Sequence, residues 1–118
     1  MKLNHITFHV RDIRKTVAFY QNLVGLQVVR QFNPGRGEIV FMVNECHETH
    51  LEFIQFDGVE KVSAVGMTLS FHVNRNLESV RQKAIEMGYA PSEIIETPPK
   101  PQYFTVLDPD QIPVEFSI

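Results

Sequence analysis

The residues of this chain with the clearest chemical potential are two glutamates that an internal repeat brings into register. Phe8-His9-Val10 recurs as Phe71-His72-Val73, and Glu52-Phe53 recurs as Glu115-Phe116, with the same separation along the chain in both cases. Equivalent positions of a duplicated module can surround a shared cavity. A carboxylate buried in such a cavity is costly without a cation or a donor beside it, so the recurring pair predicts a functional site.

The repeat also shows where the two halves differ. When the two halves are aligned without a gap, Phe41 is matched with Phe104, but His5 is matched with Thr68. The first half therefore offers an imidazole where the second half offers a neutral hydroxyl. We expect two carboxylates and one histidine to converge on the site.

The alternation of side chains along a strand predicts which residues accompany these three. Residues two apart along a strand point to the same side of the sheet. The opposite face is apolar enough to take a helix, so the face with histidine and glutamate is expected to line a cavity. Its expected members are His5, Thr7, His9, His50 and Glu52 in the first half, and Thr68, Ser70, His72 and Glu115 in the second.

The apolar pattern of the first module, residues 1–57, predicts a strand, a helix and three further strands. Residues 3–10 alternate as a strand does, and Asp12 and Gly25 are placed to begin and end a helix. The residues expected on the buried side of this helix are Ile13, Val17, Tyr20 and Val24. Three strands are expected at 27–32, 38–43 and 49–56.

The second module, residues 66–118, repeats this order after a connection at residues 58–65. A strand at 66–73 precedes a helix that Asn76 begins and Gly88 ends, with Leu77, Val80, Ala84 and Met87 on its buried side. The segment from Pro91 to Pro101 contains four prolines, which favour an edge strand or a loop over a central strand. Strands at 102–107 and 112–118 follow, joined by a turn at Asp108-Pro109-Asp110-Gln111.

Together the modules predict one α+β domain in which eight strands form a cupped mixed sheet with the helices outside. A chain of 118 residues can bury such a core, whereas each half alone would be marginal. The net charge of −3 and the scattered basic residues argue against nucleic acid as a partner. No apolar run approaches the roughly 20 residues of a membrane span. The single Cys46 and an N-terminus without a signal pattern predict a cytoplasmic protein.

Three segments resemble the vicinal oxygen chelate superfamily, which includes glyoxalase I, bleomycin-resistance proteins and extradiol dioxygenases. They are Leu3–Val10, Thr49–Phe56 around Glu52, and Tyr103–Phe116, which holds an Asp-Pro-Asp turn before Glu115. The resemblance covers essentially the whole chain and implies the two-module fold. It also implies a homodimer, with a small-molecule cavity built from modules of one chain or of two.

The resemblance further implies a divalent metal, zinc, nickel, manganese or iron. Carried over by position, its ligands are His5, Glu52 and Glu115, while Thr68 stands where such enzymes have a histidine. A hydroxyl is a poor ligand beside imidazole or carboxylate, so metal binding should be weakened. His50, two residues from Glu52 and about 7 Å away along the strand, is the best substitute ligand.

The same resemblance implies roles for the remaining site residues. A carboxylate that swings off the metal would act as the base, with Glu115 as first choice and Glu52 as second. The residues expected to line the substrate cavity are Thr68, Ser70, His72, His9 and Thr105.

Three functions follow as alternatives. The first is metal-assisted lyase or isomerase chemistry on a small oxygenated substrate, favoured by the retention of His5 and both glutamates. The second is metal-free binding of a drug or metabolite, as in the bleomycin-resistance proteins, favoured by Thr68. The third, extradiol dioxygenase activity, has less support because that chemistry needs an open iron site and usually a longer chain.

Overall fold

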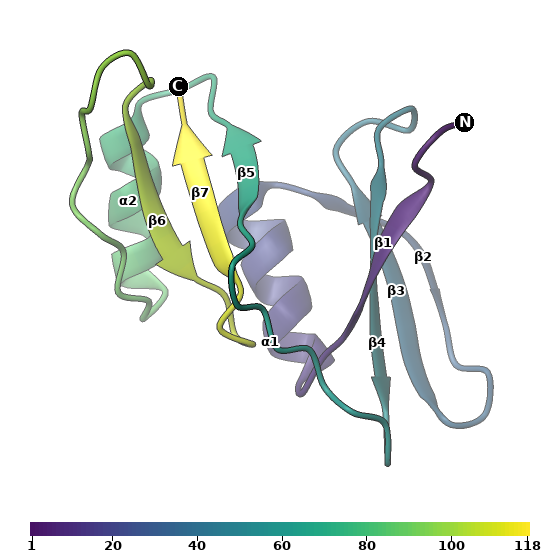
Figure 1. Cartoon of the computed structure of the whole chain (residues 1–118). Coiled ribbons are helices and arrows are strands. Elements are labelled where there is room, and N and C mark those ends of the chain that lie inside the picture. The colour runs from purple at the N-terminus through teal and green to yellow at the C-terminus, as the bar shows by residue number, and fades with distance from the viewer. The chain divides into compact units, whose positions relative to one another are not determined.

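The computed structural model describes the whole chain, residues 1–118, as two compact units (Figure 1). The first unit is Met1–Val62 and the second is Ser63–Ile118. The boundary falls inside the predicted connection at residues 58–65. None of the helices has the length and apolar character needed to span a bilayer.

The first unit is a four-stranded sheet with one helix packed on it. The strands β1 (His5–His9) and β4 (His50–Phe56) are parallel, and the sheet continues with antiparallel β3 (Gly37–Val43) and β2 (Gln27–Phe32). The helix consists of α1 (Ile13–Ala18) and a π-helical continuation, η1 (Phe19–Val24). The predicted order of elements is confirmed, and every strand end lies within two residues of its prediction.

The second unit repeats this plan with one strand fewer. The strand β5 (Leu69–His72) is parallel to β7 (Pro113–Ser117), β6 (Tyr103–Leu107) pairs antiparallel with the other edge of β7, and the helix is α2 (Leu77–Glu86). The α+β class is confirmed, but the prediction of eight strands in one sheet is wrong, since seven strands form sheets of four and three. The proline-rich segment contributes only an isolated bridge between Ile95 and Tyr103, because proline has no N–H to donate to a ladder.

The helix of the first unit begins and ends where the sequence predicts. The Asp12 carboxylate accepts hydrogen bonds from the backbone N–H of Arg14 (3.1 Å) and Lys15 (3.3 Å), and Gly25 ends the helix with a φ of 90°. The predicted buried side is only half right. Ile13 and Tyr20 are buried, whereas Val17 and Val24 are half-buried and their places are taken by Thr16, Phe19 and Leu23. The wider turn of the π-helical half rotates side chains away from α-helical spacing.

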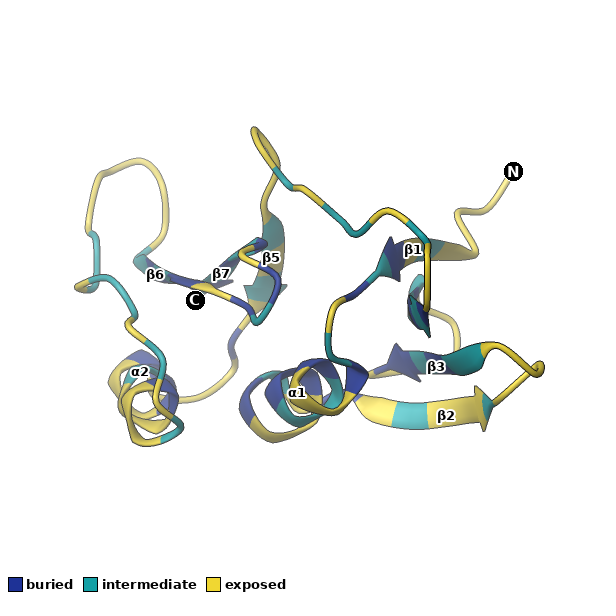
Figure 2. Cartoon of the chain, turned by 90° about the horizontal axis from the view of Figure 1, so that it is seen from below, coloured by how far each residue is buried: buried dark blue, intermediate teal, exposed yellow.

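The helix of the second unit matches its prediction more closely. The Asn76 side chain accepts a hydrogen bond from the Ser79 backbone N–H at 3.0 Å, and Leu77, Val80 and Ala84 are buried. Met87, just beyond the helix, is half-buried. In Figure 2 the buried residues of α1 and α2 form a stripe along one side of each helix. Each helix thus covers one face of its sheet and leaves the other face to side chains of the strands.

A buried carboxylate holds the turn that leads into β7. Asp108 is 1% exposed, and its Oδ1 accepts hydrogen bonds from the backbone N–H of Asp110 at 2.7 Å and of Ile112 at 3.0 Å. This turn therefore fixes where β7 begins. Since β7 carries Glu115, the turn also fixes the position of that glutamate.

Replacing Asp108 with alanine should lower the free energy of unfolding by about 3 kcal/mol, because two buried backbone donors lose a charged acceptor. Asp108→Asn keeps an acceptor oxygen and should cost about half as much. Urea denaturation followed by circular dichroism measures both losses. A loss below about 1 kcal/mol in the alanine variant would contradict this role of the carboxylate.

Candidate functional site

Each half of the repeat pairs its glutamate with a hydroxyl on the neighbouring parallel strand. In the first unit Thr7 lies opposite Glu52, and its Oγ1 donates a hydrogen bond to Glu52 Oε1. In the second unit Ser70 lies opposite Glu115, and its Oγ donates to Glu115 Oε1 at 2.8 Å. Both pairs keep the separation of the sequence repeat, so the duplication has preserved a hydroxyl–carboxylate pair as well as the glutamates themselves.

The strand pairing shows that the gapless alignment of the two halves fails at β3 and β6, the strands that pair antiparallel with the glutamate-bearing strands. Phe41 of β3 lies opposite Glu52, and Thr105 of β6 lies opposite Glu115, so Thr105 is the structural equivalent of Phe41. The match of Phe41 with Phe104 is therefore wrong by one residue. Phe104 is fully buried whereas Phe41 is half-buried, because the two side chains point to opposite faces of their sheets. Because residues 41 and 104 are both phenylalanine, the sequence alone did not reveal that the second half has one more residue before this strand than the first half has.

The polar cluster of the first unit is centred on Glu52. His5 Nε2 lies 3.6 Å from Glu52 Oε1, with the His5 side chain 43% exposed and the Glu52 side chain 13% exposed. The His5 ring also meets Phe41 edge-on, with 5.5 Å between ring centroids. His50 lies opposite His5 on β4, and its Nδ1 is 3.0 Å from the Glu48 carbonyl oxygen. His5, Thr7 and Glu52 therefore form one group, and His50 is turned toward the backbone instead.

An apolar cluster continues the same face of the first sheet. Ile39, Ile54 and Phe56 are buried together, and Phe32, Phe41 and Val59 pack against them. His9 lies level with Ile54, and its Nδ1 is buried without a hydrogen bond. This cluster was not predicted from the sequence, because the expected members of the face were all polar. The signal that could have predicted it was the spacing of two residues from Glu52 to Ile54 and on to Phe56, which places all three on one face of β4.

In the second unit a lysine already holds the glutamate. Lys100 Nζ lies 2.9 Å from Glu115 Oε2 and 3.9 Å from the centroid of the Tyr103 ring. The Lys100 hydrogen bond, and to a lesser degree that of Ser70, hold the pKa of the Glu115 carboxyl below its ordinary value, against the opposing effect of partial burial. The same hydrogen bond raises the pKa of Lys100. Sequence reasoning missed Lys100 because it lies in the proline-rich segment, whose path no periodic pattern predicts.

The other expected residues of the second unit lie on or near the same face. Thr105 is directly opposite Glu115, and His72 is opposite Ser117 at the end of β5. Thr68 is exposed and precedes the first residue of β5. Glu115 is therefore flanked by hydroxyls on both neighbouring strands, and the only charged group in contact with it is Lys100.

The metal expected from the resemblance fits these residues poorly. Glu52 Oε1 and His5 Nε2 are spaced as two ligands of one ion could be. In contrast, both oxygens of Glu115 are engaged, one by Ser70 and one by the Lys100 ammonium. Within neither unit do three or more histidine, cysteine, aspartate or glutamate side chains gather as metal ligands. The convergence of Glu52 with Glu115 stays a prediction.

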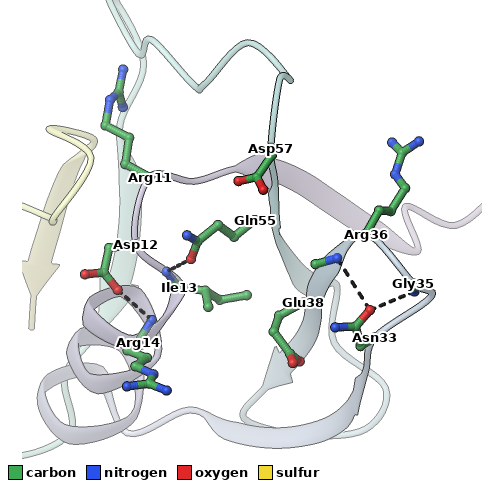
Figure 3. A pocket seen from close by; sticks show the side chains of 11 residues that line it. Arg11, Asp12, Ile13, Arg14, Asn33, Gly35, Arg36, Glu38, Gln55 and Asp57 are labelled. Carbon is green, nitrogen blue, oxygen red and sulfur yellow. Dashed lines mark hydrogen bonds between the residues drawn. The ribbon is translucent and has the colours of Figure 1, made fainter.

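A separate pocket of about 630 Å³ lies on the helix side of the first sheet (Figure 3). It is bordered by the start of α1, the turn at residues 33–37 and the end of β4. Two of its polar groups serve the fold: Gln55 Oε1 accepts from the Ile13 backbone N–H at 2.8 Å, and Asn33 Oδ1 accepts from that of Gly35 at 2.7 Å. Glu52 and its neighbours lie on the other face of the sheet, so this pocket is not part of the candidate site.

The Lys100–Glu115 pair should stabilise the protein only between an acid and an alkaline limit. The lowered pKa of Glu115 gives a contribution that is full above the ordinary value of 4.5 and is lost as the pH falls through the lowered pKa. The raised pKa of Lys100 gives a contribution that is full below 10.5 and is lost as the pH rises through the raised pKa.

The difference in unfolding free energy between the wild type and Lys100→Met should therefore be greatest between these two limits. It should shrink at acid pH and in high salt, because the pair is partly exposed. Denaturant titrations at several pH values measure it. A difference that does not change with pH would contradict the ion pair.

Comparison with known proteins places this geometry in a family. Residues 2–116 match the model of the Glyoxalase/Bleomycin resistance protein/Dioxygenase superfamily. Comparison with curated proteins gave no match.

Solved structures share the fold at low sequence identity. Leishmania major glyoxalase I is 20% identical, with a TM-score of 0.79 over 99% of this chain and 86% of its own. The antibiotic binding protein TnmS3 from Streptomyces sp. CB03234 is 19% identical, with a TM-score of 0.76 over 99% and 94%. The fosfomycin resistance protein FosX from Listeria monocytogenes is 16% identical, with a TM-score of 0.78 over 99% and 92%. By its sequence and its fold, this chain belongs to the glyoxalase, bleomycin-resistance and dioxygenase superfamily.

Proposed function

We propose that this chain binds a small molecule against the glutamate-bearing face of its sheets and needs no resident metal ion to do so. The observation that carries the proposal is the contact between Lys100 and Glu115, at 2.9 Å. A metal site presents carboxylates whose negative charge is left for the ion. Here the charge of Glu115 is already balanced by an ammonium group of the same chain.

The cost of burying carboxylates supports this proposal. A partly buried carboxylate is tolerated when hydrogen bonds or an opposite charge replace the lost water. Glu115 has both, from Ser70 and Lys100, and Glu52 has the Thr7 hydroxyl with His5 nearby. The retained glutamates therefore have an explanation that does not involve a metal. TnmS3 is an example of an antibiotic binding protein with this fold.

Metal analysis tests the proposal. The wild-type protein is incubated with zinc, nickel, manganese or iron(II), desalted, and measured by inductively coupled plasma mass spectrometry. We expect less than about 0.1 equivalent per chain, and no rise in melting temperature on adding the same ions, since a bound ion would stabilise the folded state. One equivalent per chain would overturn metal-free binding.

The second candidate is metal-assisted lyase or isomerase chemistry, favoured by the 3.6 Å between His5 Nε2 and Glu52 Oε1. In that case one equivalent of metal should be found, and His5→Ala and Glu115→Gln should each abolish it. The homodimer implied by the resemblance, and the cytoplasmic location expected from the single Cys46 and the N-terminal sequence, stay predictions alongside either function.

A further inference from the structure

We infer that the first unit selects ligands that join a flat apolar body to a positively charged group, and that Glu52 determines this preference. The inference rests on the proposed function and adds the chemical class of the ligand. It follows from a difference between the two repeats: Glu115 has a lysine of its own, whereas Glu52 has only the Thr7 hydroxyl and the His5 imidazole, which is charged only when protonated.

The charge of Glu52 is left for a ligand to balance. Its Oε1 accepts the Thr7 hydrogen bond and faces His5 Nε2, but its Oε2 makes no bond, and neither lysine nor arginine contacts it. The side chain is only 13% exposed, so water can solvate it only in part. A positively charged or strongly donating group of small size would supply what Lys100 supplies to Glu115.

The apolar part of the preference comes from the residues beside Glu52. Phe41 lies directly opposite it across the β3–β4 ladder, with the His5 ring edge against the Phe41 ring. Ile39, Ile54 and Phe56 lie farther along the same face but are themselves buried, and the half-buried Phe41 packs against them. Phe41 is therefore the apolar side chain that a ligand can reach. A flat apolar molecule that covers Phe41 would have its end at the Glu52 carboxylate. Aromatic faces also attract cations, which favours the same class of ligand.

Two exposed arginines oppose the inference. One is Arg36, whose guanidinium carbon is 4.3 Å from the centroid of the Phe56 ring. The other, Arg30, lies opposite Phe41 on the edge strand β2, and its guanidinium carbon is 4.7 Å from the centroid of the Phe32 ring. If either arginine dominated recognition, an anionic ligand would be preferred. Both are exposed whereas Glu52 is mostly buried, and a buried charge is screened less by water and salt, so the Glu52 preference should prevail.

Three probes that differ mainly in charge can test this. They are 1-naphthylmethylamine, 1-naphthylmethanol and 1-naphthoate, which present a cation, a neutral donor and an anion on one ring system. Their dissociation constants are measured with the full chain by ¹H–¹⁵N chemical-shift titration at pH 7 and fixed ionic strength. The amine should bind about tenfold tighter than the alcohol, which corresponds to about 1.4 kcal/mol. The naphthoate should bind weakest.

Variants assign the preference to single residues. Glu52→Gln should bring the amine and the alcohol within about twofold of each other, while Glu45→Gln, an exposed glutamate of the same unit, should leave the tenfold ratio unchanged. Phe41→Leu should weaken all three probes by a similar factor and preserve their order. Spectra of each variant without probe establish that it is folded.

The outcomes separate this inference from the proposed function. Binding of all three probes with equal affinity, or preference for naphthoate, would overturn the inference and leave metal-free binding intact. A cation preference that persists in Glu52→Gln, or no binding of any probe at millimolar concentration, would also overturn it. The metal analysis decides the proposed function independently of these results.

Discussion

Replacing Gly37 with alanine is expected to lower the free energy of unfolding by about 4 kcal/mol, the range of the most damaging single substitutions. Gly37 is the first residue of β3 and has a φ of 140°, which side chains rarely tolerate. A Cβ there would lie 2.0 Å from the Gln55 carbonyl oxygen and 2.8 Å from Phe56 Cδ1. Because the first contact is with backbone, no side-chain rotation relieves it, and the β3–β4 ladder itself must move.

Gly35→Ala is the matched control. Gly35 also has a positive φ, 104°, but a Cβ at this position would meet nothing within 4 Å. Its substitution should cost about 1 kcal/mol, the penalty for the backbone conformation alone. Thermal unfolding should show a fall of roughly 20 °C for Gly37→Ala and about 5 °C for Gly35→Ala. Equal falls would show that the close approach of β3 to β4 does not matter.

The second large effect is a gain of metal affinity. In the double variant Thr68→His with Lys100→Met, the second unit would carry the histidine that the family resemblance implies at this position, and Glu115 would lose its ammonium partner. Thr68 lies two residues before Ser70, which is opposite Glu115 on the neighbouring strand. Residue 68 is thus offset from Glu115 by about 7 Å along the strand, a span that a histidine and a carboxylate can close around one ion. We expect the dissociation constant for nickel to fall by about 100-fold relative to the wild type, with each single change giving about tenfold.

Competition with a chromophoric chelator measures these constants. Thr68→His with Lys83→Met, which removes an exposed lysine of α2 instead, is the control and should match Thr68→His alone. If the double variant binds nickel no better than the wild type, Lys100 is not what keeps metal from Glu115.

The sequence predicted the helices and strands better than the way the strands are arranged into sheets. Caps at Asp12 and Asn76 and the alternation along the strands are local signals, and the elements lie where these signals put them. The π-helical turn after α1 has no comparable signal, so the buried side of that helix was partly wrong. The missing eighth strand follows from the prolines of residues 91–101, which had already favoured a loop as one of two alternatives.

For the candidate site, the repeat predicted which strand side chains lie near each glutamate. It gave no information about a side chain that reaches a glutamate from a loop. Glu52 with Thr7, and Glu115 with Ser70, could be anticipated from strand parity because the parallel register is the same in both copies of the repeat. Lys100 could not, since it reaches Glu115 from an irregular segment 15 residues earlier. Without Lys100, the Glu115 carboxylate would be open to a metal ion. With Lys100 in contact, the charge of Glu115 is already neutralised.

The titration of Glu115 tests the central claim most directly. Its side-chain carboxyl carbon is followed by ¹³C NMR from pH 2 to 7 in the wild type and in Lys100→Met, with Glu115→Gln to assign the signal. We predict that the pKa of Glu115 lies below its ordinary value of 4.5 in the wild type and moves up in Lys100→Met. Titration at the same pH in both proteins would contradict the account, because Glu115 would then carry its charge without help from Lys100.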